Sequence, residues 1–427
     1  MAEFRIPYDR QPLAFRLPDE HPVEVIAPVD APAAPDPVPV VQAALDHPVG
    51  GVSLSDFSDA RSVAIAINDK TRPVPHEYLL PPLLARLEGL GLPPEAITLI
   101  IATGAHPPML PEEFRLVVPA EVLARHAVIC HDCDDREGLV YLGQTARGTP
   151  AWMNRRFVEA DLRLVVGNIE PHQFMGFSGG VKSAAIGLAG RDTINRNHAM
   201  LTEPGARLGE YENNPPRQDV EAIGRMAGVH WALNAIINRQ KQIVAAVAGQ
   251  PRAVMDAGIP LARQHCQVTV REPYDLVIAS PGGYPKDLNL YQAQKALAHA
   301  ALVTKPGGTV ILVAACPEGV GSRSYEQWML ERPMGSYQEV CERFAREGFR
   351  VGPHKAFLVA RDASRARVLL VSEMEPGLVR RLLLTPVASL EEALSLALAD
   401  LPAEARLAIL PAASATVPVL RDTAMAE

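Results

Sequence analysis

Short runs of β-branched and aliphatic residues recur along the chain, and they constrain the fold more than any other feature. The first runs span residues 63–67 and 97–101, and residues 77–90 between them have helical periodicity. Strands without polar alternation are buried on both faces, which is typical of parallel sheets covered by helices. Further strands are predicted at 127–130, 162–166, 276–279, 309–314, 366–371 and 406–410.

The order of these elements predicts an α/β protein of two domains with mostly parallel sheets and a cleft between them. We expect an N-terminal domain at 1–268, a C-terminal domain at 269–427 and a hinge near 266–274. About 20 residues at the end of the chain are candidates to pack back on the first domain. Helices are expected at 292–302 and at 389–399, the second beginning with a capping box at Ser389. The segment 30–41 is rich in Pro and Ala, which indicates an extended connector.

Composition excludes several classes of function. The formal net charge of -8 over 427 residues gives no basic surface for nucleic acid or anionic membranes. No apolar stretch reaches the roughly 18 residues that a membrane span needs, and the N-terminus lacks a signal-peptide pattern. The five Cys are irregularly spaced, which argues against a disulfide framework and favours a cytoplasmic location. Cys130 and Cys133 have no second pair at zinc-site spacing, so a metal or redox role is not favoured.

Polar segments follow the predicted strands, where ligands bind in parallel α/β sheets. After the first strand, Arg72 could hold a phosphate or carboxylate by a two-pronged contact, and Asp69 could orient it. An ordinary helix cap is the alternative for this segment. After the second strand, Gly104 and Pro107 flank His106 and present its imidazole at the sheet edge, although a lone histidine is more often structural.

The longest polar segment, 167–183, contains His172 and ends in Ser178, Gly179, Gly180, Lys182 and Ser183. The Ser-Gly-Gly turn could place backbone N–H groups around a phosphate at a helix start. The spacing is not that of a Walker A motif, so no nucleotide triphosphatase is inferred. His198 follows sixteen positions after Lys182.

A fourth cluster opens the second domain, with Gly-Gly-Tyr-Pro at 282–285 followed by Tyr291, Gln292 and Lys295. Gln292 and Lys295 are three residues apart and therefore share one helix face. A Gln and a Lys that point into a cleft suit a carboxylate. A solvated helix face is the other reading.

Together these segments resemble the nickel-dependent lactate racemase family. The matching motifs are D-x-T-R-P at 69–73, A-T-G-x-H at 102–106, H-x-F-x-G-x-S-G-G-x-K-S at 172–183, N-H at 197–198, and G-G-Y-P followed by Y-Q-x-x-K at 291–295. They stand in the family's order at similar spacing. The resemblance rests on motifs over roughly residues 60–300 and on fold pattern elsewhere.

The resemblance implies a nickel-pincer nucleotide, which is a nickel ion held by a pyridinium mononucleotide with two sulfur-bearing arms. Lys182 matches the lysine that can join the cofactor's thioamide, and whether it does so here stays open. His198 matches the nickel ligand. His106 and His172 match the acid and base, and Arg72, Gln292 and Lys295, with Tyr291 beside them, match the substrate-binding group. Further cofactor contacts are implied for Asp69, Ser178, Gly179, Gly180 and Ser183.

The implied reaction inverts C2 of a small 2-hydroxy acid by proton-coupled hydride transfer through a planar 2-keto acid. Each antipode needs its own base, which explains two histidines, and an unperturbed imidazole pKa of about 6.5 suits proton exchange near neutrality. The implied partners are the hydroxy acid and the enzymes that make and load the cofactor. The sequence leaves the oligomeric state open, with a homodimer as one alternative.

Three positions depart from the family pattern. Val181 and Pro107 stand where Arg is frequent, and Ile186 stands where Pro is common. They put phosphate contacts and substrate choice in doubt and leave the hydroxy acid unidentified. The residues His354, Lys355 and Phe357 lie in the region expected to carry a substrate-pocket aromatic.

Two other functions remain as alternatives. One is a non-catalytic paralogue that binds the cofactor or a hydroxy acid. The other is a zinc hydrolase built from His106, His172 and His198. The hydrolase would need three imidazoles on one ion and an open position for water.

Overall fold

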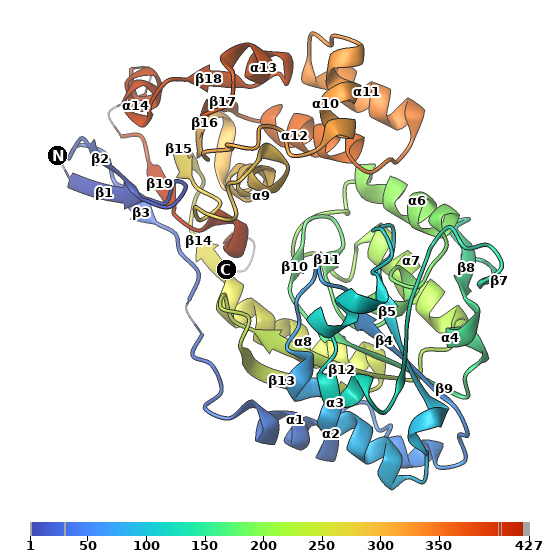
Figure 1. Cartoon of the computed structure of the whole chain (residues 1–427). Helices are drawn as coiled ribbons and strands as arrows, with labels where there is room; N and C mark the ends of the chain where they lie inside the picture. The colour runs from blue at the N-terminus through green and yellow to red at the C-terminus, as the bar shows by residue number, and fades with distance from the viewer. Residues whose placement is uncertain (1, 30, 400, 403, 422–427) are drawn as a thin grey trace, which may run out of the picture. The chain divides into compact units, whose positions relative to one another are not determined.

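The computed structural model describes residues 2–29, 31–399, 401–402 and 404–421, which form two compact units (Figure 1). The central unit is Asp30–His265, and the terminal unit combines Met1–Val29 with Cys266–Glu427. Each unit contains one six-stranded sheet that is parallel or mostly parallel, so the predicted α/β class is confirmed. Within the described residues, no helix is long and apolar enough to cross a membrane.

The sheet of the central unit has the order β13-β12-β9-β4-β5-β6, and only β13 runs antiparallel to its neighbour. The strands are β4 (Val63–Asn68), β5 (Ile97–Ala102), β6 (Ala127–Cys130), β9 (Leu162–Asn168), β12 (Trp231–Ile237) and β13 (Ile243–Gly249). The four strands predicted in this part of the chain are confirmed as β4, β5, β6 and β9. Two small hairpins accompany the sheet, β7 (Leu139–Gln144) with β8 (Pro150–Asn154) and β10 (Pro171–His172) with β11 (Gly176–Phe177).

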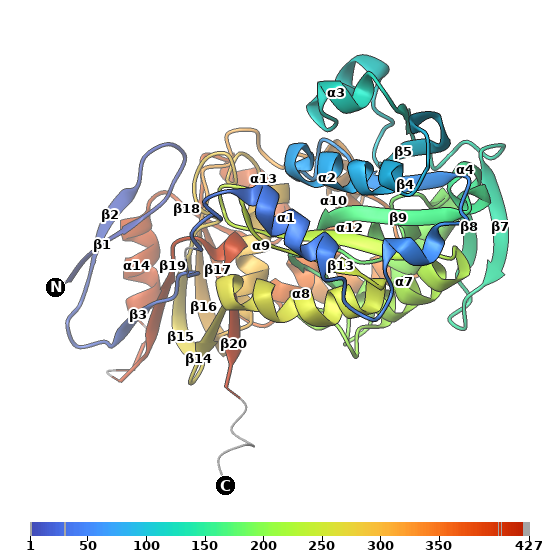
Figure 2. The same cartoon turned by 90° about the horizontal axis from the view of Figure 1, so that it is seen from below.

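Helices cover the central sheet, with α1 and α2 along one face and α7 along the other (Figures 1 and 2). The helix predicted at 77–90 is confirmed as α2 (His76–Gly89), whose leucines pack on the sheet. The other helices are α1 (Pro37–Asp46), α3 (Ala120–Leu123), α4 (Arg155–Glu159), α5 (Lys182–Ala185), α6 (Arg191–Ala199), α7 (Pro215–Met226) and α8 (Pro251–Cys266).

The segment at 30–41 is not an extended connector throughout, because α1 begins at Pro37. The Asp36 side chain accepts a hydrogen bond from the N–H of Val38, and proline is well suited to the first helical turn. Buried Val41, Ala44 and Leu45 then attach the helix to the core. Asp30 lies outside the described residues.

The terminal unit has an all-parallel sheet of order β18-β17-β16-β15-β19-β3. Its strands are β3 (Val23–Val25), β15 (Tyr274–Ala279), β16 (Thr304–Val313), β17 (Arg367–Val371), β18 (Thr385–Val387) and β19 (Leu407–Leu410). The helices are α9 (Leu290–Ala301), α10 (Arg323–Glu331), α11 (Tyr337–Glu347), α12 (Pro353–Ala363), α13 (Pro376–Arg381) and α14 (Leu390–Leu398). The predicted strands and helices of this region are confirmed, including the Ser389 cap of α14.

Two segments near the ends of the chain belong to the terminal unit, whereas we predicted that they belong to, or pack on, the first domain. Residues 1–29 were assigned to the first domain, but β3 pairs with β19, and the hairpin of β1 (Ala2–Ile6) and β2 (Leu13–Leu17) contributes to the terminal unit's core. Near the C-terminus, β20 (Val417–Leu420) pairs with β14 (Gln267–Val270) of the same unit rather than with the central sheet. Strand pairing over such sequence distances leaves no local pattern in the chain.

Candidate active site

Three of the predicted polar segments follow β9, β4 and β5, which are consecutive in the sheet order of the central unit. The three strands are parallel, so their carboxyl ends lie at one edge of the sheet. Tight turns shape this edge, because Arg72 N–H bonds to Asp69 O and His106 N–H bonds to Thr103 O. The three segments therefore begin at the same edge of the central sheet.

Asp69 and His106 form a carboxylate–imidazole pair. Oδ2 of Asp69 lies 2.8 Å from Nδ1 of His106, and Thr71 Oγ1 donates to Oδ1 of the same carboxylate at 2.8 Å. Burial raises the pKa of Asp69, but the hydrogen bonds from His106 and Thr71 outweigh it and hold the pKa below its usual value. The ionised carboxylate can only accept, so Nδ1 of His106 carries the proton and the lone pair of the neutral ring is on Nε2. Asp69, expected among the cofactor contacts, is thus engaged with the histidine.

His172 and His198 both contact the same aromatic ring, that of Phe174. The ring of Phe174 is 4.9 Å from that of His172 and 5.2 Å from that of His198, edge-on to both. The β10–β11 hairpin supplies His172, and the last turn of α6 supplies His198. Met175 N–H donates to Nδ1 of His172 at 3.3 Å, so the neutral ring of His172 carries its proton on Nε2, opposite to His106.

Lys182 begins α5 and is half-buried. Desolvation lowers its pKa to about 7, and the positive charges of Arg72 and Arg217 add to this effect while Glu170 opposes it. A large fraction of the side chain is then neutral near pH 7, and a neutral amine is nucleophilic.

Hydrogen bonds to neighbouring segments of the central unit hold the Ser178–Gly180 turn in place. Ser178 Oγ donates to the carbonyls of Asn168 and Glu170, and Ser178 N–H bonds to Glu170 O. Gly180 N–H donates to Asn234 Oδ1 at 2.7 Å. These two N–H groups are already engaged, so the expected N–H cradle for phosphate does not include them.

Gly179 is required by its backbone, with a φ of +87°. A Cβ there would also stand 2.7 Å from Cγ1 of Ile169. Ser183, the second residue of α5, donates from Oγ to Asn68 Oδ1 at 3.5 Å and so connects this segment to the end of β4.

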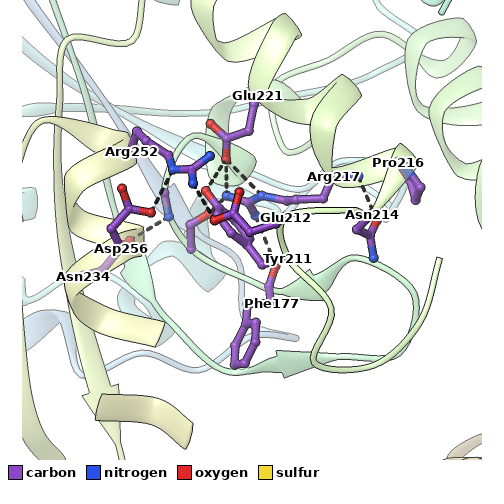
Figure 3. A network of polar contacts seen from close by, with 12 residues as sticks. Phe177, Tyr211, Glu212, Asn214, Pro216, Arg217, Glu221, Asn234, Arg252 and Asp256 are labelled. Carbon is purple, nitrogen blue, oxygen red and sulfur yellow. Dashed lines mark hydrogen bonds and ion pairs between the residues drawn. The ribbon is translucent and has the colours of Figure 1, made fainter. Parts of the chain in front are cut away.

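Arg217 of α7 fixes both sides of this turn (Figure 3). Its guanidinium is fully buried and donates to the carbonyls of Phe177 and Gly179, each at 3.1 Å. The same group pairs with Glu221 at 2.7 Å and stacks over the ring of Tyr211. The segment that carries Lys182 is therefore anchored to α7.

The remaining predicted residues form a separate group in the terminal unit. Lys295 Nζ donates to Gln292 Oε1 at 3.1 Å, which confirms that the two side chains share one face of α9. Lys355 Nζ lies 5.0 Å from the ring centroid of Tyr291, and the His354 ring meets the same tyrosine edge-on. Phe357 instead stacks on Phe344 in the core. Of the three residues considered for the pocket aromatic, only His354 and Lys355 adjoin Tyr291.

The three histidines do not form a zinc site: among the described residues, His106, His172 and His198 do not bring three ligand atoms within 4.8 Å of one another. Asp132, Cys133 and Asp134 do so, but Arg191 holds the Asp134 carboxylate through two contacts of 2.6 Å. Burial also raises the pKa of the Cys133 thiol, which disfavours the thiolate that binds metal.

Comparison with known proteins gives the same assignment along the whole chain. Residues 8–209 match the model of the lactate racemase N-terminal domain, and residues 269–417 match that of the lactate racemase C-terminal domain. A lactate racemase of Thermoanaerobacterium thermosaccharolyticum is 30% identical over 420 residues, covering 96% of this chain and 98% of the relative. A lactate racemase of Lactiplantibacillus plantarum is 31% identical over 330 residues, covering 76% and 77%.

The chain belongs to the lactate racemase family. The apoprotein structure of the Thermoanaerobacterium enzyme superimposes with a TM-score of 0.89 at 30% identity, covering 98% of this chain and 100% of that one. A Thermotoga maritima protein with 18% identity and a TM-score of 0.63, covering 89% and 97%, shares the fold. Family membership makes the chain an isomerase of the racemase class, as the sequence predicted.

Two departures from the family pattern have a physical account. Val181 is buried, and a Cβ on Gly224 of α7 would stand 2.5 Å from the Val181 Cβ, so this position packs between α5 and α7. Ile186 is buried as well. Pro107 is exposed at the surface and its effect on the site has no explanation in these contacts.

Sequence reasoning missed two fully buried polar side chains of the site, Arg217 and Asn234, and gave no role to buried Asn197, although it belongs to the N-H motif. A signal existed for Asn234, because it interrupts the apolar run of β12 and a polar residue in a central strand needs a partner. No local signal distinguishes Arg217 from the other arginines on helices.

Proposed function

We propose that this chain racemises or epimerises a small 2-hydroxy acid by proton-coupled hydride transfer with a nickel-pincer nucleotide. His106 and His172 are the acid and base, His198 is the nickel ligand and Lys182 holds the cofactor. The observation that supports this most is the Asp69–His106 pair, because an exposed imidazole backed by a buried carboxylate is a general base. In the family's motifs, this histidine matches one of the two that act as acid and base.

The residues fit the cofactor in two respects. The lowered pKa of Lys182 leaves a large fraction of its amine neutral near pH 7, and a neutral amine suits attack on a thiocarbonyl carbon. His198 lies at the end of α6 with Nδ1 directed at the Oδ1 of Asn197, and a neutral imidazole is an accepted nickel ligand. When bound, the cofactor would take the C2 hydrogen as hydride and return it.

Side chains of the protein carry out the proton transfers. Nε2 of neutral His106 takes the hydroxyl proton as the C2–H bond breaks, so C2 becomes a planar keto carbon and no carbanion forms. As hydride returns to the other face of C2, protonated His172 gives its Nε2 hydrogen to the substrate oxygen and becomes neutral. For the opposite antipode His172 is the base and His106 the acid. Both roles need a hydrogen on Nδ1 of His172, so its ring gives up the contact with the N–H of Met175 during turnover, and exchange with water resets the two rings.

The substrate carboxylate needs cationic partners while C2 is planar. Arg72 at the end of β4 offers a two-pronged guanidinium. The Gln292–Lys295 pair of α9 offers an amide and an ammonium on one helix face. We propose these three side chains, with Tyr291 beside them, as the substrate-binding group. Screening a panel of 2-hydroxy acids identifies the substrate.

The test uses the full chain co-expressed with cofactor-making enzymes. Metal analysis and intact mass should give nickel and an added cofactor mass, and a panel of 2-hydroxy acids should lose optical rotation. His106→Ala and His172→Ala should abolish racemisation and keep nickel, whereas His198→Ala should lose nickel. Stoichiometric zinc without the added mass would contradict the proposal. Nickel and cofactor without turnover of any hydroxy acid would favour the binding paralogue.

A further inference from the structure

Asn197 is a fully buried amide that immediately precedes His198 in α6. Its Nδ2 donates to the backbone carbonyl of Pro216 and to Oδ2 of Asp219, each at 2.9 Å. Both partners lie at the start of α7 or one turn into it. The amide is therefore held by a second helix.

The orientation of the Asn197 amide follows from its partners. A backbone carbonyl can only accept, so the atom facing Pro216 O must be the NH₂ nitrogen. The amide oxygen then faces Nδ1 of His198, at 3.2 Å. An amide oxygen can only accept, so Nδ1 of His198 bears a hydrogen. In the neutral ring this places the lone pair on Nε2.

Asp219 in turn is fixed. It is buried, and Thr145 Oγ1 donates to its Oδ1 from the loop between β7 and β8. The chain of contacts therefore runs from Thr145 through Asp219 and Asn197 to His198, across three elements of the central unit. Each of these side chains has one orientation that satisfies its hydrogen-bond donors and acceptors.

We propose that Asp219 and Asn197 are positioning residues that set the tautomer and ring orientation of His198 for metal binding through Nε2. This inference rests on the proposed function, since it takes His198 as the nickel ligand. Ligand histidines need the lone pair at the metal and a partner for the other ring nitrogen, and loss of such partners lowers metal affinity about 10- to 100-fold. Here the partner is an amide oxygen whose direction is set by Asp219 and Pro216.

The first experiment observes the tautomer without cofactor. Long-range ¹H–¹⁵N correlation of histidine-labelled full-length apoprotein, at a pH where the rings are neutral, distinguishes a proton on Nδ1 from one on Nε2. His198→Gln identifies the signal. The wild type should show Nδ1–H at His198. A proton on Nε2 would overturn the proposal, and this result stands even if a variant fails to fold.

The second experiment uses matched variants. Asn197→Ala removes the acceptor and should shift His198 toward Nε2–H, and the loaded protein should release nickel to a chelator about 10- to 100-fold faster. Asp219→Asn can still accept from Asn197 and should keep the wild-type tautomer. Thr145→Val loosens the far end of the network and should lower stability without changing the tautomer or nickel retention.

The outcomes separate this inference from the proposed function. If loaded wild type holds no nickel, the proposed function fails, and the apoprotein spectra still decide the tautomer. If Asn197→Ala folds and keeps both the Nδ1–H signal and wild-type nickel retention, the positioning role is wrong.

Discussion

At the scale of single residues, the Asp69–His106 pair makes the sharpest prediction. Asp69→Asn keeps the shape but can present its NH₂ group to the imidazole, which favours the wrong tautomer. We expect kcat of the loaded enzyme to fall at least about 100-fold with little change in melting temperature. Thr71→Val is the matched control, because it removes one hydrogen bond to Asp69 and leaves the carboxylate on His106. Equal activity of Asp69→Asn and wild type would remove Asp69 from the orienting role.

Lys182 gives a pH-dependent prediction. Its folded pKa of about 7 lies below the ordinary 10.5, so the unfolded chain binds more protons between these values and stability rises with pH across that window. The penalty is complete below pH 7 and disappears above pH 10.5. Lys182→Met should therefore stabilise the apoprotein by about 1–3 kcal/mol at pH 7, since each unit of pKa shift is worth about 1.4 kcal/mol before relaxation.

Thermal denaturation of the apoprotein between pH 6 and 10 measures this difference. The gain of Lys182→Met should shrink as the pH rises. Lys182→Arg is the control, because it keeps a positive charge at every pH and should be less stable than wild type throughout. A Lys182→Met protein that is less stable than wild type at pH 7 would contradict the assignment.

At the scale of elements, Arg217 connects α7 to the Ser178–Gly180 turn. Arg217→Met removes both carbonyl contacts and leaves Glu221 without its buried partner. Breaking a buried pair from one side costs about 3–5 kcal/mol, and chemical denaturation should show a loss of that size. The double variant Arg217→Met with Glu221→Leu should recover part of it. A single variant within about 0.5 kcal/mol of wild type would show that the turn needs no anchor.

Elements differ in how far the sequence predicts them. Strands β4, β5, β9 and β15 were predicted because continuous runs of β-branched and aliphatic residues are typical of buried parallel strands. β12 and β13 were missed, because small residues and Asn234 interrupt their apolar pattern. The candidate site motifs were located by their position after predicted strands. Arg217 and the contacts of Asn197 were not predicted, since they depend on how α6 and α7 pack.

At the scale of the whole molecule, residues 1–29 complete the terminal unit. Ile6, Phe15 and Leu17 belong to its core, and β3 forms an edge of its sheet. Removing residues 1–29 should destabilise this unit by several kcal/mol, because each buried apolar side chain contributes about 2–5 kcal/mol. Limited proteolysis should then cut within residues 266–421 and spare the central unit.

Point variants test the same idea without truncation. Leu17→Ala should lower the terminal unit's stability by about 2–5 kcal/mol. Val25→Ala, at a side chain that is 53% exposed, should change it by less than about 0.5 kcal/mol. If removal of residues 1–29 leaves the proteolysis pattern unchanged, the assignment of these residues to the terminal unit's core is wrong. The sequence could not predict this return of the N-terminus, because the pairing of β3 with β19 spans almost the entire chain.

In the proposed reaction, C2 is inverted by hydride transfer, and proton exchange is confined to the hydroxyl oxygen. The most direct measurement is racemisation of a single antipode of a 2-hydroxy acid by the loaded enzyme in D₂O, with mass and NMR analysis of the product. Hydride transfer predicts that the opposite antipode forms with ordinary hydrogen retained at C2. Deuterium at C2 would mean that a proton is removed from carbon, and it would contradict the mechanism.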